Sequence, residues 1–265
     1  MTADDLDELP PPDPDKGVFI FSSGRKGSGK SVVCRWWFDA YPYDKLCIDV
    51  THDIAADFRR EGVDFTEIRG GMDMPARLPA FRPGQPRTYI FCPDMGDASV
   101  VDEMDRVVGL CLARSPTALW CDEYGEQATG ASTPPNLKRA LHHGRHDALT
   151  LLIACPRPVD VPMLTIGQAD KVYTFATQIS ADRERVAKSI GWNVKEFDAV
   201  NAEITRLGPY WHSMYQQASN ELWIMPPLPV RNRGRRPVGD PAELVAAAEL
   251  DEQAGAIRAA RSKRP

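Results

Sequence analysis

Residues 24–31 read Gly-Arg-Lys-Gly-Ser-Gly-Lys-Ser and fit the pattern G-x-x-x-x-G-K-[ST] at every fixed position. Glycines let the backbone turn tightly, so that successive N–H groups face one phosphate chain. A helix that begins directly after such a loop adds the positive end of its dipole at the same place. We call residues 24–31 the phosphate loop. The residues predicted to bind a nucleotide are Gly24, Gly27, Ser28, Gly29, Lys30 and Ser31.

The flanking sequence supports this interpretation. Residues 17–21 form a short apolar run typical of a strand, and residues 31–41 have helical periodicity. A chance glycine-rich turn is the alternative, and the strand and helix on its two sides favour phosphate binding instead. Lys30 is then predicted to contact the β- and γ-phosphates of ATP and Ser31 to hold Mg²⁺.

Two adjacent carboxylates, Asp122 and Glu123, follow the apolar run at residues 118–121. In P-loop enzymes the acid at a strand end holds Mg²⁺, and a following Glu can accept a proton from the attacking water. A strand that ends in Asp-Glu is common. Its place downstream of the phosphate loop, in a chain where strands and helices alternate, gives the pair its significance.

Other candidate metal ligands are less convincing. His142, His143 and His146 lie close together, but no carboxylate or cysteine stands at a useful spacing from them. A solvated or phosphate-facing basic surface is therefore favoured over a metal site. The six cysteines have no C-x-x-C spacing, so we expect buried reduced thiols. They are Cys34, Cys47, Cys92, Cys111, Cys121 and Cys155.

Composition limits the class of protein. The 265 residues are 43% hydrophobic and 26% charged, as in soluble globular proteins. No apolar run is long enough to span a membrane, and the N-terminus is acidic where a signal peptide is basic and then apolar. We therefore expect a cytoplasmic protein. The net charge of -5 gives no general case for nucleic-acid binding, although a local basic surface remains open.

The sequence divides into three parts. Residues 1–16 are rich in acids and proline and predict a disordered arm, either solubilising or a partner-docking or DNA-mimicking segment. Residues 17–228 predict the ATPase domain. Residues 229–265 predict a basic, flexible tail whose arginine cluster at 231–236 suits a phosphate backbone or serves only solubility.

Strands and helices alternate along residues 17–228, which predicts an α/β fold with a mostly parallel sheet and helices on both faces. We expect strands at residues 17–21, 45–50, 65–68, 88–92, 118–121, 150–155 and 171–175, helices at 31–41, 55–60, 100–113, 134–145, 181–190 and 194–207, and a hairpin at 210–216 and 221–225.

The chain resembles the HerA/FtsK branch of P-loop ATPases, which includes small viral genome-packaging ATPases. In that family a Gly-Arg pair precedes a strand, an Arg-Pro pair follows it, and a V-D-V-like stretch comes next. Residues 144–145, 157–158 and 159–161 match these features, and the next strand ends at Phe175. Asp49 resembles the family's Asp after strand two. The resemblance covers residues 17–228 and implies a three-layer, RecA/ASCE-like P-loop NTPase.

The resemblance also implies roles for single residues. Lys30 and Ser31 bind phosphate and Mg²⁺, and Asp122 holds Mg²⁺. Glu123 activates water, and Arg145 is the candidate finger that acts on a neighbouring subunit's nucleotide, with Arg139 and Arg157 as alternatives. One position departs from the family, because Pro156 stands where the family has a polar sensor Gln. A proline side chain cannot contact the γ-phosphate through a hydrogen bond.

The function implied by the resemblance is that of an ATP-hydrolysing motor, a homo-oligomeric ring and by resemblance a hexamer. It would move double-stranded DNA into a viral procapsid, in the host cytoplasm, with a portal or vertex protein as partner and transient association with the virion. A filamentous-phage-type assembly ATPase and a P-loop small-molecule kinase are alternatives. Pro156 motivates a third, a nucleotide-gated scaffold without turnover.

Overall fold

The computed structural model describes residues 16–71, 75, 78–79, 85–114, 116–128 and 132–228. The predicted acidic arm, apart from Lys16, and the predicted basic tail lie outside these residues. The elements are β1 (Phe19–Ser23), α2 (Lys30–Ala40), β2 (Lys45–Ile48), α3 (Asp53–Glu61), β3 (Thr66–Arg69), β4 (Thr88–Cys92), α4 (Val100–Arg114), β5 (Thr117–Cys121), the 3-10 helix η2 (Tyr124–Glu126), α5 (Pro135–His143), β6 (Leu149–Cys155), the 3-10 helix η3 (Pro158–Asp160), α6 (Met163–Gly167), β7 (Lys171–Phe175), α7 (Ser180–Ser189), α8 (Val194–Leu207), β8 (His212–Gln216) and β9 (Glu221–Met225).

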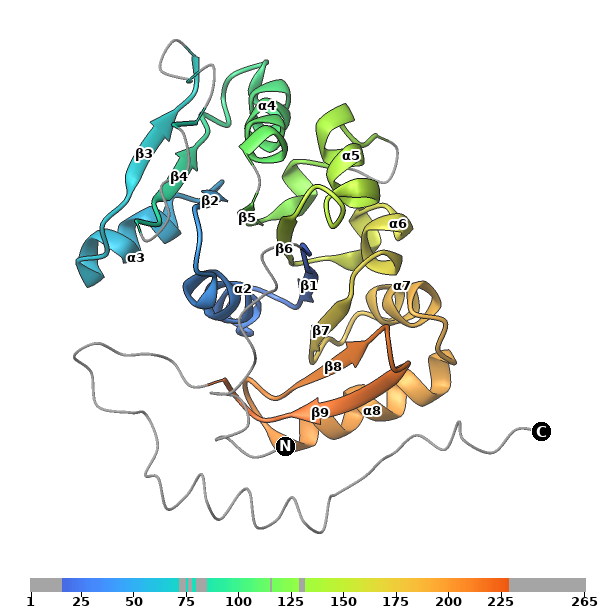
Figure 1. Cartoon of the computed structure of the whole chain (residues 1–265). Coiled ribbons are helices and arrows are strands. Elements are labelled where there is room, and N and C mark those ends of the chain that lie inside the picture. Colours follow the sequence, from blue (N-terminus) through green and yellow to red (C-terminus); the bar gives the residue numbers. More distant parts are fainter. Residues whose placement is uncertain are drawn as a thin grey trace.

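The described strands form one sheet in the order β3-β4-β2-β5-β6-β1-β7-β8-β9 (Figure 1). Strands β3 to β7 in this order pair in parallel, and β8 and β9 extend the sheet with antiparallel pairs. Strand β6 lies between β1, which leads into the phosphate loop, and β5, which leads to Asp122. All seven parallel strands therefore send their carboxyl ends to one edge of the sheet.

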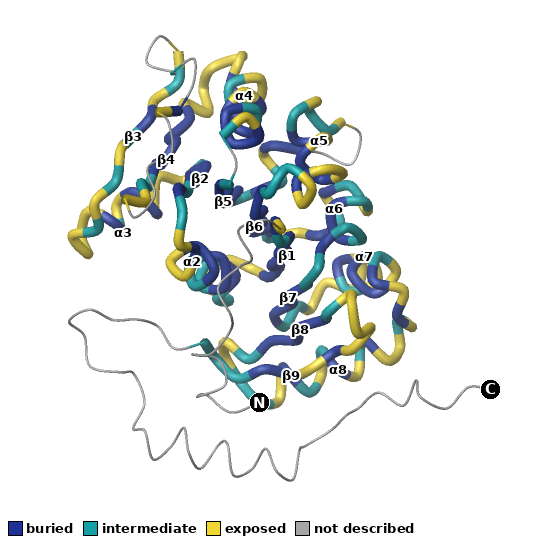
Figure 2. The backbone as a smooth tube through the Cα atoms, in the orientation of Figure 1, coloured by how far each residue is buried: buried dark blue, intermediate teal, exposed yellow. Residues whose placement is uncertain are grey.

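Helices cover both faces of the sheet, as predicted (Figures 1 and 2). Alternate residues of β1 point to opposite sides, so that Phe21 packs in one apolar core and Ile20 in the other. Helices α2 and α3 contribute to the core around Ile20, and helices α4 to α8 contribute to the core around Phe21. Both faces of the central strands are buried, which explains why their sequences are almost continuously apolar.

The predicted elements agree with the structure except near their ends. The first strand begins and ends two residues later than predicted, and the short helix α6 was not predicted. The helix expected at residues 134–145 ends at His143. The chain turns there, and Ala148 adopts a left-handed φ of 51° before β6 begins. Arg145 therefore lies in a turn and not on a helix. The six cysteines are buried and free, as expected. Among the described residues no helix is long and apolar enough to cross a membrane.

A buried carboxylate joins three elements at the amino edge of the sheet. Asp44, directly before β2, accepts hydrogen bonds from the backbone N–H of Arg87 (2.9 Å) and from its guanidinium (3.0 Å). It also pairs with Arg114 at the end of α4, while its own carbonyl oxygen accepts from Ala118 N–H of β5. A buried charge is tolerated only when it is paired and hydrogen-bonded, and Asp44 meets both conditions.

We predict that Asp44→Ala lowers the free energy of unfolding by about 3 kcal/mol, because two guanidinium groups lose a buried anionic partner. Urea denaturation measures the change. Asp57→Ala is the matched control, since Asp57 pairs with Arg60 on the exposed surface and should cost under about 0.5 kcal/mol. Equal effects of the two substitutions would contradict the assignment.

Candidate nucleotide-binding site

The phosphate loop leaves the carboxyl end of β1 and returns into α2. Gly27 and Gly29 have φ values of 77° and 109°, in the left-handed region that glycine adopts without steric cost. A Cβ added to Gly29 would lie only 2.9 Å from Cε1 of Phe175 at the end of β7. Both the backbone conformation and this close approach therefore require glycine. The loop begins next to β6, where Gly24 N–H donates to the carbonyl of Cys155.

Two side chains at the start of α2 contact the two carboxylates that follow β5. Lys30 Nζ lies 3.0 Å from Glu123 Oε1, and the side-chain exposures of the two residues are 6% and 23%. Ser31 Oγ donates to Asp122 Oδ1 at 3.2 Å. Four predicted site residues, separated by about ninety positions in the sequence, thus meet in pairs at one edge of the sheet.

Burial dominates the electrostatics of Asp122. It raises the pKa of this carboxyl to about 6, and the negative charges of Glu123 and Asp49 act in the same direction. Lys30 and the hydrogen bond from Ser31 oppose the rise. A cation close to Asp122 would stabilise its ionised form, because the positive charge offsets the cost of burying the carboxylate.

The donor set fits Mg²⁺. Ser31 Oγ and Asp122 Oδ1 are hard oxygen atoms within hydrogen-bond distance of each other, of the kind that Mg²⁺ prefers. The described residues contain no group of three or more His, Cys, Asp or Glu side chains able to enclose a metal. This agrees with the way Mg²⁺ binds at nucleotide sites, where substrate phosphates and waters complete the coordination.

Asp49, the acid after β2, is fully buried. Its Oδ2 accepts a 2.8 Å hydrogen bond from Ala55 N–H in the first turn of α3, and burial raises the pKa of its carboxyl. The other oxygen, Oδ1, has no hydrogen-bond partner among the described residues. The Asp49 side chain thus holds the first turn of α3.

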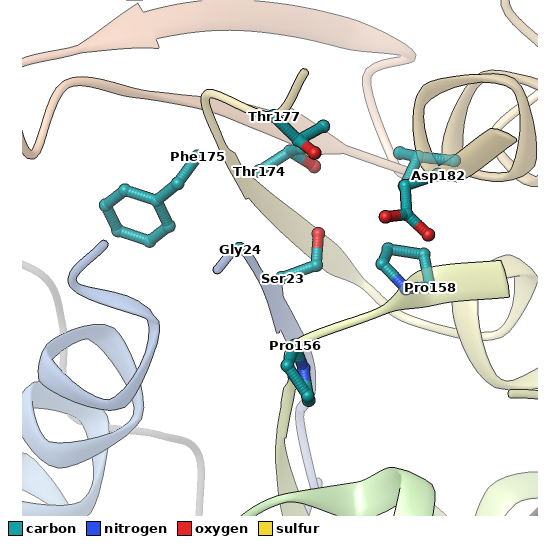
Figure 3. Close-up of a pocket in the computed structure, with 9 residues that line it drawn as sticks. Ser23, Gly24, Pro156, Pro158, Thr174, Phe175, Thr177 and Asp182 are labelled. Atoms are coloured by element: carbon teal, nitrogen blue, oxygen red, sulfur yellow. The ribbon is translucent and has the colours of Figure 1, made fainter. Parts of the chain in front are cut away.

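A small cavity lies beside the phosphate loop, between the ends of β1, β6 and β7 (Figure 3). Its volume is about 10 Å³, which is room for roughly one water and far too little for a nucleotide. Pro156 lines it together with Gly24. The hydroxyl groups of Ser23 and Thr174 are buried there without a hydrogen-bond partner in the described part of the chain.

Arg145 lies at the opposite edge of the sheet. Its Nη1 is 2.5 Å from Oδ1 of Asp170, whose Oδ2 accepts from Phe19 N–H at the start of β1. The seven residues of β6 separate Arg145 from the carboxyl edge, a distance of about 20 Å. Arg145 therefore cannot reach the phosphate loop of its own chain. Its side chain is 48% exposed.

The two alternative arginines lie elsewhere. Arg139, on α5, pairs with Asp147 at an exposed position. Arg157 follows β6 at the carboxyl edge and faces Asp160 and Asp182 at 3.8 and 3.9 Å. Of the three arginines, only Arg157 is thus at the same edge as the phosphate loop. The predicted basic surface near His142 and His143 is exposed at the end of α5.

Sequence reasoning missed two aromatic residues at the phosphate loop. Phe175 covers Gly29, and Cδ1 of Tyr210 would lie 3.5 Å from a Cβ at Gly29. Phe175 was noted only as a strand end, and Tyr210 only as part of the expected hairpin. Neither residue belongs to a sequence motif that predicts contact with the phosphate loop.

Comparison with known proteins gives structural matches alone. No family model and no curated protein matches the sequence. The genome-packaging NTPase B204 of Sulfolobus turreted icosahedral virus 2, in complex with ATP-gammaS, is 18% identical, with a TM-score of 0.61 over 81% of this chain and 98% of that one. Its AMPPCP complex gives 0.59, and B204 of Sulfolobus turreted icosahedral virus, described as a DNA-packaging ATPase, gives 0.55.

At this level of identity the likeness concerns the fold. It covers nearly the whole of the B204 chain and 81% of this one. The predicted resemblance to small viral genome-packaging ATPases is thereby confirmed at the level of structure, and the chain has the α/β fold of a P-loop NTPase.

Proposed function

We propose that this protein hydrolyses ATP and, as a ring-shaped oligomer, uses the energy to move double-stranded DNA into a viral procapsid. The observation that carries the ATPase assignment is the pairing of Lys30 with Glu123 and of Ser31 with Asp122. These contacts bring a phosphate-binding cation, a metal-binding pair and a candidate base to one place. The DNA substrate is supported by the fold shared with the packaging NTPase B204.

Each residue has a defined task in this proposal. Backbone N–H groups of the phosphate loop and Lys30 bind the phosphates, and Ser31 and Asp122 hold Mg²⁺. When bound, the metal supplies charge neutralisation on the phosphate oxygens. Glu123 accepts a proton from the attacking water. Glu123 pairs with Lys30 in the structure, so phosphates that attract Lys30 would release the carboxylate for this role.

A ring would present this site to a neighbouring subunit. Arg145 is too far from its own phosphate loop and is half exposed at the other edge of the sheet, so it can serve only a neighbour's nucleotide. The ring, by resemblance a hexamer, the portal or vertex partner, and the host cytoplasm with transient virion association belong to the same proposal.

The direct test measures ATP turnover with and without double-stranded DNA, together with the mass of the particle in ATP. We expect DNA-stimulated turnover and a mass of several subunits. Lys30→Ala should abolish turnover, because the phosphates lose their main cationic partner. Lys26→Ala, an exposed lysine of the same loop, should leave it near the wild-type rate. Turnover of the Lys30→Ala protein at the normal rate would remove the catalytic assignment.

We predict that Glu123→Gln slows hydrolysis by at least about 10²-fold, since the amide cannot accept a proton. ATP binding should persist, and its affinity should not fall, because Lys30 no longer has an anionic competitor. Single-turnover hydrolysis and ATP titration measure the two effects. Glu126→Gln, an exposed acid on η2, is the control and should be neutral. An unchanged rate for Glu123→Gln would move the base to another carboxylate.

The finger is tested by mixing subunits. Arg145→Ala should reduce turnover by about 10³-fold or more, as expected for an arginine finger. Mixing it with Lys30→Ala subunits should restore activity, because some junctions then combine an intact phosphate loop with an intact arginine. A mixture that stays inactive at every ratio would exclude a finger acting between subunits.

Asp170→Asn separates this role from a structural one. The substitution removes the charge that pairs with Arg145 but keeps an oxygen for the Phe19 N–H. If Arg145 acts on a neighbour's nucleotide, Asp170→Asn retains turnover. If the ion pair itself is what matters, both variants lose activity together, and Arg157 at the carboxyl edge becomes the candidate.

A further inference from the structure

The contacts of Lys30 and Ser31 with the acids after β5 indicate the direction in which a nucleotide lies in the proposed function. Lys30 and Ser31 meet the acids that follow β5, two strands away from β1 on one side. In the proposed function the γ-phosphate points toward these acids. The sugar and base must therefore leave in the opposite direction, toward β7 and β8, which lie on the other side of β1.

Two aromatic rings stand on that side of the loop. Phe175 at the end of β7 and Tyr210 in the connection from α8 to β8 both approach Gly29, where an added Cβ would lie 2.9 Å from Phe175 Cε1 and 3.5 Å from Tyr210 Cδ1. Phe175 is buried and lies over the segment that leads from Gly24 into α2 (Figure 3). Tyr210 is different, because 55% of it is exposed to solvent.

The backbone holds Tyr210 in an uncommon conformation. Its φ is 67°, in the left-handed region that bulky residues rarely adopt and that is a recognised mark of functional sites. The carbonyl of Tyr210 accepts a 3.1 Å hydrogen bond from Nδ1 of His212. A carbonyl only accepts, so Nδ1 carries the proton. The hydrogen bond to His212 holds the Tyr210 peptide in this uncommon conformation.

His212 anchors the Tyr210 peptide to the site. It is fully buried, and burial lowers the pKa of its imidazole to about 4, so the ring is neutral near pH 7. Its ring lies 4.9 Å from the ring of Phe175, centre to centre. A chain of contacts therefore runs from Gly29 through Phe175 and His212 to the backbone of Tyr210. It fixes an exposed aromatic ring beside the phosphate loop.

We propose that Tyr210 is the base-stacking residue of the nucleotide site and that its exposed ring takes the purine of a nucleoside triphosphate whose phosphates lie in the phosphate loop. The inference rests on the proposed function and extends it from phosphate binding to recognition of the base. Aromatic side chains stack on bases through their π-faces, and such contacts contribute measurably to affinity. Phe175 is buried and packs against Gly29, so it supports the loop and leaves base stacking to the exposed Tyr210.

The test compares a ligand that has a base with one that lacks it, using the full-length protein. Dissociation constants of ATP and of inorganic tripolyphosphate are measured for the wild type, Tyr210→Phe and Tyr210→Asn. Asparagine tolerates the left-handed backbone, so the second variant removes the ring with little added strain. We expect Tyr210→Asn to weaken ATP binding about 10-fold and to leave tripolyphosphate binding unchanged, while Tyr210→Phe resembles the wild type.

Two controls make the result specific. Trp223→Ala removes another exposed aromatic residue, on β9, and should change neither constant. Lys30→Ala should weaken both ligands, which shows that tripolyphosphate occupies the phosphate loop. Unchanged ATP affinity in Tyr210→Asn would overturn base stacking, and so would equal weakening of both ligands. Failure of wild-type protein to bind either ligand would instead overturn the proposed nucleotide site.

Discussion

The ion pair between Lys30 and Glu123 is the interaction on which the site depends. A lysine with a side-chain exposure of 6% needs an anionic partner, because an unpaired buried ammonium is costly. Glu123 is that partner, at 3.0 Å. In the proposed function, phosphates bound by the loop would compete with Glu123 for Lys30 and would free the carboxylate to accept a proton.

The parallel sheet is what allows this pairing. Ser23 of β1 lies opposite Cys155 of β6, and Cys121 of β5 lies opposite Ile153, so the strand ends meet at one edge. The N–H of Asp122 donates to the carbonyl of Ile48, which extends the ladder by one residue and holds the acid against β2. Sheet hydrogen bonds thus position the carboxylates. The phosphate loop and the start of α2 position the Lys30 ammonium. In the described sheet, β6 is the one strand between β5, which leads to the acids, and β1, which leads to the loop.

The sequence predicted much of this arrangement because its main signals are local. The phosphate loop at residues 24–31, the acids after residue 121 and the apolar strands of the sheet each show in a short stretch of chain. The position of Arg145 was harder to predict from the sequence. The turn after α5 is held by contacts that are distant in the sequence, since Arg145 pairs with Asp170, which in turn accepts from Phe19 N–H of β1. The two aromatic residues beside the loop could not be predicted, since no sequence pattern near Phe175 or Tyr210 indicates that they approach Gly29.

The two edges of the sheet carry different candidate functional residues, and this difference affects which assemblies are compatible with the proposed site. The carboxyl edge holds the phosphate loop, the acids and Tyr210, whereas the amino edge holds Arg145. An isologous dimer brings the same patch of both subunits together, so it does not in general join one edge to the other. A head-to-tail contact joins two different surfaces, and its repetition gives a ring where the rotation closes and an open filament where it does not. If Arg145 acts between subunits, the arrangement within one chain therefore favours a head-to-tail assembly over an isologous dimer, and the proposed ring is its closed form.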